Sequence, residues 1–130
     1  MIQSVFGMEK KAIVADFIQL EGTQGDAFWK LYDEYETERK ELGRRRIALL
    51  EKYAENYTSL DEATTAEILD EMMSLQTGTD KLIASYAKKI KKEVDVKTAA
   101  QFYQIEGYLV SKIRTEILEN IPVIGELENM

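Results

Sequence analysis

Residues 24–56 constrain the fold of this 130-residue chain more than any other segment, because they repeat apolar and aromatic side chains at helical spacing and contain no proline. At about 100° per residue these side chains fall within one stripe about 100° wide, which is typical of an amphipathic helix. The stripe consists of Phe28, Leu31, Tyr32, Tyr35, Leu42, Leu49, Leu50, Tyr53 and, just beyond the segment, Tyr57. The pattern predicts one helix about 50 Å long, whose stripe has to be covered by other helices or by a partner.

Periodicity and end signals predict three further helices, over about residues 7–18, 60–94 and 95–120. A capping-box sequence places the start of the third helix at Ser59 or Asp61, and Asp95 is the expected N-cap of the fourth. Pro122 is the only proline of the chain, and it ends the fourth helix because proline disfavours helical backbone at the residue before it. The short acidic tail, residues 123–130, is expected to be mobile.

The apolar faces of these helices indicate how they pack. The face of the first helix comprises Ile13, Phe17 and Leu20. The face of the third is wide, with a stripe of Leu69, Met73, Ile83, Ala87 and Ile90 that is extended on one side by Ile68, Leu75, Leu82 and Tyr86. A face this wide predicts contacts with more than one neighbour. We therefore expect a single all-α domain over residues 1–130, in which the two long helices form an elongated antiparallel hairpin that the other two cross.

The composition excludes most familiar chemistry. The chain has no histidine and no cysteine, so disulfides, thiol nucleophiles, zinc fingers, histidine metal sites and Ser-His-Asp relays are impossible. The formal net charge of −7 argues against nucleic acid as a partner. No apolar run approaches the length of about 20 residues that a transmembrane helix needs, so no membrane insertion is expected. With no glycine-rich phosphate loop and no catalytic constellation, we expect neither an enzyme nor a bound cofactor or metal.

Charged residues interrupt the apolar stripes of the two long helices. Arg39 and Arg46 lie near the centre of the stripe on the second helix, and Asp80 lies near the centre of the stripe on the third. In an antiparallel hairpin Arg39 then faces Asp80, and Arg46 falls near Glu71 or Met73. We interpret these residues as interhelical ion pairs that set the register of the hairpin.

Glu106 lies within the stripe of the fourth helix and offers Arg46 another partner. Two alternatives to structural ion pairs stay open: a charged interior site for an anion or a metal, or arginines whose charged ends reach solvent without a fixed partner.

Two acidic clusters occupy other parts of the long helices. They comprise Asp33, Glu34, Glu36 and Glu38, and Asp61, Glu62, Glu67, Asp70 and Glu71. Carboxylates one helical turn apart can hold a hard cation, but no calcium-loop spacing is present. We interpret both clusters as solvated helix faces.

Seven tyrosines and one tryptophan are a surplus of aromatic surface for a chain of this length. Candidate residues for contact with another protein are Trp29, Tyr32, Tyr35, Leu50, Tyr53, Tyr86 and Tyr103. A closed four-helix bundle would bury most of them as core. A thinner arrangement would leave a wide apolar face open, as binding surfaces and dimer interfaces do.

Several short segments are similar to one known family. They are residues 20–24 (LEGTQ), 27–36 (AFWKLYDEYE), 46–57 (RIALLEKYAENY), 97–106 (KTAAQFYQIE) and 121–122 (IP). Together they resemble the Spy/CpxP-like periplasmic proteins, which are defined by an LTXXQ motif, and more closely the branch that carries Phe-Trp and Gln-Ile-Glu segments. The resemblance covers about residues 9–124. Glu21 replaces the threonine of the first motif, and Gly22 stands where proline is common. The second motif, at residues 94–98, has neither threonine nor glutamine at the motif positions, where Asp95 and Thr98 stand instead.

The resemblance implies an exported, periplasmic protein of long bent helices that pairs into a cradle-like homodimer, with its signal peptide removed ahead of Met1. Members of the family act as ATP-independent chaperones, as envelope-stress regulators or in metal resistance. The function it implies is non-enzymatic binding of unfolded or partner polypeptide. The alternatives are a regulatory or sensor subunit of an envelope-stress or metal-response system, and a purely structural helical module.

Overall fold

A computed structural model describes residues 2–120 of the chain, and the side chains of residues 10–116. Over these residues the chain forms four α-helices and no strand, which confirms the all-α prediction. The helices are α1 (Ile2–Phe17), α2 (Gly22–Asn56), α3 (Glu62–Glu93) and α4 (Val96–Asn120). The first helix begins earlier than expected, and the other boundaries lie close to the predicted ones. The prediction for the tail, residues 123–130, falls outside the described residues.

Aspartate residues are the N-caps of two of the helices. The Asp61 carboxylate accepts a hydrogen bond of 2.7 Å from the backbone N–H of Thr64, so α3 starts at the second of its two predicted positions. The Asp95 carboxylate accepts one of the same length from the N–H of Thr98, as predicted for α4. Hydrogen bonding to the charged carboxylate holds the pKa of Asp61 and of Asp95 below the ordinary range.

Two glycines allow the chain to turn sharply from α1 into α2. Gly22 has a φ of 65°, a left-handed conformation that residues with a Cβ atom rarely adopt. A Cβ atom added at Gly25 would lie 3.1 Å from the backbone oxygen of Leu20, so the connection passes unusually close to the helix. The turn sends α2 back alongside α1.

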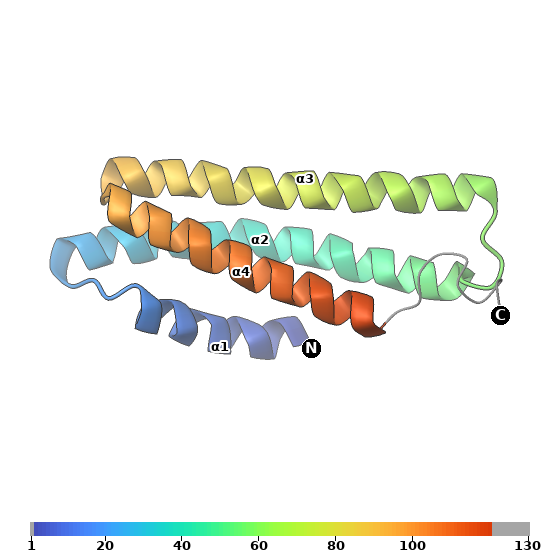
Figure 1. Cartoon of the computed structure of the whole chain (residues 1–130), viewed down its shortest axis with the longest axis horizontal. Coiled ribbons are helices and arrows are strands. Elements are labelled where there is room, and N and C mark those ends of the chain that lie inside the picture. Colours follow the sequence, from blue (N-terminus) through green and yellow to red (C-terminus); the bar gives the residue numbers. More distant parts are fainter. Residues whose placement is uncertain (1, 121–130) are drawn as a thin grey trace.

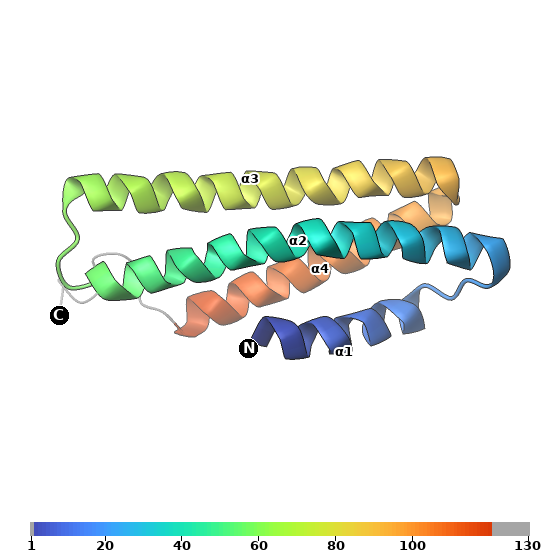
Figure 2. The same ribbon diagram turned by 180° about the vertical axis from the view of Figure 1, so that it is seen from behind.

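The four helices form an elongated stack that is thicker at one end than at the other (Figure 1). In both views α2 and α3 run antiparallel and side by side, and α4 returns along them from the α3–α4 connection (Figure 2). The shorter α1 packs along α2 and α4 near the α1–α2 connection. Because α1 and α4 stop short of the α2–α3 turn, the far part of the α2–α3 pair has fewer neighbours.

We call the thicker part of the stack the closed end, and it contains the hydrophobic core. Its buried members come from all four helices: Val14, Ile18, Phe28, Leu31, Tyr32, Tyr35, Ile83, Tyr86, Ile90, Ala99, Phe102, Leu109 and Val110. The rings meet edge to face, with centroids 5.1 Å apart for Tyr35 and Phe102 and 5.6 Å apart for Tyr35 and Tyr86. Such aromatic contacts add to the free energy that burial of the rings contributes.

The buried face of α1 differs from the predicted one. Val14 and Ile18 are buried together with Lys10, whereas Ile13 and Phe17 are exposed. Lys10, Val14 and Ile18 are spaced four residues apart and therefore share one side of the helix. The helix is rotated because Lys10 has to reach two buried carboxylates, an interaction that hydrophobic periodicity does not reveal.

The wide face of α3 is covered only in part. Ile68 and Leu75 are buried, but Leu69 and Met73 are about half exposed. The faces that α3 turns to α2 and α4 are covered, and the remaining apolar side chains lie at the surface. Within the described residues, no helix is both long enough and apolar enough to cross a membrane.

Candidate functional site

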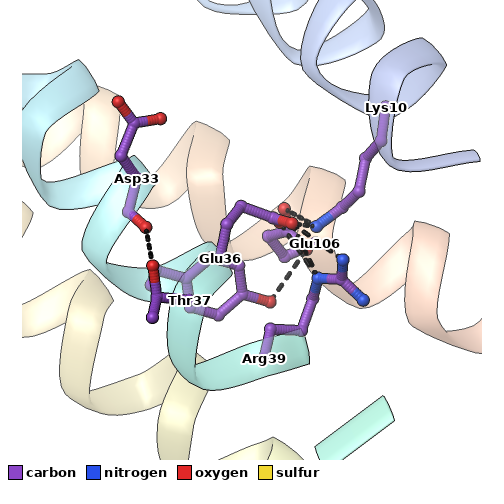
Figure 3. A network of polar contacts seen from close by, with 7 residues as sticks. Lys10, Asp33, Glu36, Thr37, Arg39 and Glu106 are labelled. Atoms are coloured by element: carbon purple, nitrogen blue, oxygen red, sulfur yellow. Dashed lines mark hydrogen bonds and ion pairs between the residues drawn. The ribbon is translucent and has the colours of Figure 1, made fainter. Parts of the chain in front are cut away.

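The most strongly interacting polar residues surround the ammonium group of Lys10. Lys10 comes from α1, and its side chain is 2% exposed. Its Nζ atom lies 2.5 Å from Oε1 of Glu36 on α2 and 2.7 Å from Oε1 of Glu106 on α4. It also lies 5.2 Å from the ring centroid of Tyr35, within the range of a cation–π interaction. Figure 3 shows the lysine reaching from α1 toward the two carboxylates.

Arg39 completes this group of charges on α2. Its Nε and Nη2 atoms donate hydrogen bonds of 2.9 and 2.8 Å to Oε2 of Glu36, one helical turn away (Figure 3). Burial would raise the pKa of Glu36, but the hydrogen bonds from Arg39 and the charge of Lys10 outweigh it, so this pKa lies below the ordinary range. Burial would likewise lower the pKa of Arg39, and the Glu36 carboxylate raises it instead.

Glu106 is wholly buried and takes its second partner from the aromatic core. The Tyr35 hydroxyl donates a hydrogen bond of 2.9 Å to Oε2 of Glu106. Burial, together with the negative charge of Glu106, raises the pKa of Tyr35 far above its ordinary range. The phenol therefore keeps its proton and remains a donor to the carboxylate.

Lys10, Glu36, Arg39 and Glu106 carry two charges of each sign, and we call them the buried charge network. They join α1, α2 and α4 and fix how α1 docks, because each carboxylate is held by a cation. A network in which the charges are paired and hydrogen-bonded can remain ionised inside a protein. Its chemistry is that of a structural cluster, since its carboxylates are already occupied.

Four of the five predicted ion-pair residues (Arg39, Asp80, Glu71 and Glu106) form ion pairs in the structure, but the predicted pairings are wrong. Arg39 pairs with Glu36 on its own helix, and Asp80 faces Arg114 of α4 at 3.7 Å. The reason is that α4 and α1 lie against the interior face of the α2–α3 pair. Arg39 and Asp80 therefore each pair with a residue other than the one predicted.

Arg46 also lacks the partners predicted for it. Glu71 pairs with Arg45 at 2.5 Å, and Glu106 pairs with Lys10. Within the described residues no hydrogen bond or ion pair involves the Arg46 guanidinium. Burial and the positive charges of Arg114 and Arg39 lower the pKa of Arg46, as expected for a cation without a counter-ion.

Most of the predicted protein-contact residues belong to the core. Tyr32, Tyr35 and Tyr86 are almost completely buried, and Tyr53 is 9% exposed. The prediction of contact surface is wrong for these four tyrosines. Tyr32 and Tyr35 pack against Phe102 of α4, and the Tyr86 ring of α3 packs against that of Tyr35. Tyr53 is buried nearer the α2–α3 turn, where its ring packs against that of Tyr57. Burial and a hydrogen bond to Glu38 raise the pKa of Tyr86 to about 12, so its hydroxyl is engaged as well.

The other three candidates differ in exposure. Trp29 and Leu50 are partly buried, and the ring of Trp29 lies edge-on to its neighbours Phe28 and Tyr32. Tyr103 is 56% exposed on α4. Of the seven candidates, only Tyr103 therefore presents most of its side chain to solvent.

Other large apolar side chains are exposed, and several lie at the far part of the α2–α3 pair. We call residues 44–56 of α2 and 62–76 of α3 the open end. It exposes Ile47, Leu69, Met72 and Met73. On another face of the same two helices, a shallow groove is lined by both, and the pairs Arg45–Glu71 and Lys52–Glu67 bridge it. The open end is thus an apolar surface next to a strongly charged one.

Sequence reasoning missed Lys10 and misassigned Glu36. Lys10 lies four residues before Val14 and eight before Ile18, so all three share one side of the helix. This spacing is the signal in the sequence that could have indicated a buried lysine. Glu36 was interpreted as part of a solvated acidic face, but its side chain is only 14% exposed. A glutamate within an apolar stripe, such as Glu106, requires a buried cation, and that requirement was the second signal.

The described residues contain no group of three acidic side chains that is placed to hold a metal ion. No protein-family model, curated protein or solved structure matches the chain. The family resemblance therefore remains a prediction that rests on the quoted segments.

Proposed function

We propose that this protein binds unfolded polypeptide without catalysing a reaction, and that the open end of the α2–α3 pair is the binding surface. The observation that carries this proposal is the exposure of Leu69, Met72 and Met73 within one and a half turns of α3, with Ile47 exposed on the neighbouring helix. Each of these side chains is at least 40% exposed.

The chemistry of this surface suits loose binding of varied sequences. Methionine is flexible and polarisable, and it is common on surfaces that accept many partners. The net charge of −7 attracts basic segments of an unfolded chain, while the apolar side chains supply the contact. The buried charge network and the aromatic core lie at the closed end, away from this surface.

An aggregation-suppression assay with a chemically denatured client tests the proposal. We expect the wild-type protein to suppress light scattering in a concentration-dependent way. The double variant Leu69→Asp, Met73→Asp should suppress it several-fold less, because it replaces two exposed apolar side chains with charges.

A matched control is available on the same helix. Gln76 and Thr77 are exposed and polar, so Gln76→Asp with Thr77→Asp adds the same charge without removing apolar surface. This control should suppress aggregation as well as the wild type. Equal loss in both double variants, or no suppression by the wild type at several-fold excess, contradicts the proposal.

The proposal extends to a cradle-like homodimer and to an exported location. Dimerisation would cover part of the exposed apolar surface, and a symmetric pair is the commonest way for such a surface to be shared. The homodimer is tested by measuring the molar mass of the wild type and of the Leu69→Asp, Met73→Asp variant by light scattering. A monomeric wild type contradicts the proposed homodimer. The exported location is supported by the family resemblance alone, and cell fractionation tests it.

A further inference from the structure

A small cavity lies among the helices between the buried charge network and the open end. Its volume is about 20 Å³, and residues of all four helices line it. The polar part of its lining includes Lys10, Arg39, Arg46 and Thr79, and no carboxylate lines it. Apolar side chains of α2 and α4 form the rest of the wall.

The cations around this cavity outnumber the anions. Lys10 and Arg39 are neutralised by the two glutamates of the buried charge network. The next cations along the stack are Arg46 and Arg114. Arg114 lies 3.7 Å from the carboxylate of Asp80, and no ion pair among the described residues involves Arg46. One positive charge is therefore left without a counter-ion.

Arg46 carries this charge. It lines the cavity, makes no ion pair within the described residues, and has Arg39 and Arg114 as its electrostatic neighbours. The Nη2 atom of Arg114 is itself buried and makes no hydrogen bond. The bonds from Arg39 to Glu36 use Nε and Nη2, and its Nη1 atom is not engaged in them. A partly buried guanidinium without an anion is costly, because burial removes part of its hydration and no carboxylate compensates for that loss.

We propose that the cavity binds one small monovalent anion, for which chloride is the simplest candidate, held by Arg46 with Arg39 beside it. The volume accommodates one particle about the size of a water molecule, which is too small for a nucleotide or a sugar phosphate. A water molecule would fit but would leave the charge uncompensated. A single negative charge balances the group of cations, which is why we infer a monovalent ion.

Thermal unfolding in two sodium salts tests this proposal. The protein is melted in sodium chloride and in sodium gluconate at the same ionic strength, since gluconate is monovalent but too large for the cavity. Because a ligand that binds only the native state raises the Tm, we expect a Tm higher by about 5 °C at chloride concentrations tenfold above the dissociation constant.

Two arginine variants separate the cavity from general salt effects. Arg46→Gln should abolish the difference in Tm between the two salts. Arg44→Gln should preserve it, because Arg44 is exposed and pairs with Glu41 at the surface. A chloride effect of equal size in all three proteins, or no effect in the wild type, overturns the proposal.

A crystallographic measurement keeps the test independent of how Arg46→Gln folds. Crystals of the wild-type protein are soaked in sodium bromide, and the bromide is located by its anomalous scattering. An anomalous peak within about 3.5 Å of the Arg46 guanidinium supports the site. A cavity without such a peak overturns it.

Discussion

The two ends of the stack use the same kind of sequence in different ways. At the closed end, Phe28, Tyr32 and Tyr35 of the α2 stripe are buried by the other helices, and the buried charge network lies beside them. At the open end, α2 and α3 still lie side by side, but Ile47 and Met73 are exposed and the described ion pairs lie at the surface. Figures 1 and 2 show why: α1 and α4 run along the closed end and stop before the α2–α3 turn.

The comparison shows that an amphipathic stripe alone does not determine how deeply its residues are buried. The stripe of α2 continues with little change from Phe28 to Tyr57, whereas the number of helices that cover it decreases. Stability should therefore depend on the closed end, and surface chemistry on the open end. The following predictions compare the two.

The largest expected effect comes from removing one charge of the buried network. Glu106→Gln leaves the buried Lys10 with a single carboxylate partner, so we expect a loss of about 3 kcal/mol in the free energy of unfolding. Glu71→Gln removes the partner of Arg45 at the open end, where both side chains are partly exposed, and should cost less than about 1 kcal/mol. Denaturant unfolding of both variants measures the difference.

The double variant Lys10→Met, Glu106→Leu serves as the control for this prediction. It removes both charges, so it should be more stable than the sum of the two single changes implies. Equal destabilisation by Glu106→Gln and Glu71→Gln would mean that the buried charges of the closed end contribute no more to the free energy of unfolding than the surface ion pair of the open end.

An intermediate effect is expected from acid. The pKa of Glu36 is lower in the folded protein than its ordinary value of 4.5, so the stability that its charge contributes is fully present above that value and is lost as the pH falls through the folded pKa. The difference in unfolding free energy between the wild type and Glu36→Gln should therefore shrink as the pH falls below about 4.5, by at most about 1.4 kcal/mol per pH unit.

Asp33→Asn is the matched comparison, because Asp33 lies on the same helix but pairs with Lys11 at the surface. Denaturant unfolding across this pH range measures both variants against the wild type. A difference between wild type and Glu36→Gln that does not change with pH would show that the Glu36 charge contributes nothing to folding.

Much of the fold was predictable because it depends on local interactions. Helix positions follow from spacing, and Asp61 and Asp95 act as N-caps through hydrogen bonds to residues three positions ahead. The α1–α2 turn is equally local, since Gly22 adopts a conformation that glycine tolerates. These features require no knowledge of where the other helices lie.

The partners of the buried charges were not predictable, because they depend on how the helices are placed around one another. Arg39 lies in the stripe where it was predicted, but its nearest carboxylate is that of Glu36 on the same helix rather than that of Asp80. The rotation of α1 is set by Lys10, a residue that an apolar pattern excludes from the core. Burial of Tyr32 and Tyr35 depends on α4 lying over this part of the α2 stripe, which the sequence of one helix cannot indicate.

The smallest expected effect is on the stability of the open end. Leu69→Asp with Met73→Asp, the variant that should weaken polypeptide binding, should change the free energy of unfolding by less than about 0.5 kcal/mol per substitution. The reason is that both side chains are about half exposed in the folded protein, so little apolar burial is lost. Leu75→Asp, two residues after Met73 but on the buried face of α3, provides the contrast and should destabilise severely. If the first variant unfolds as readily as the second, Leu69 and Met73 are covered in solution, and the open end is closed by contacts beyond those of the described helices.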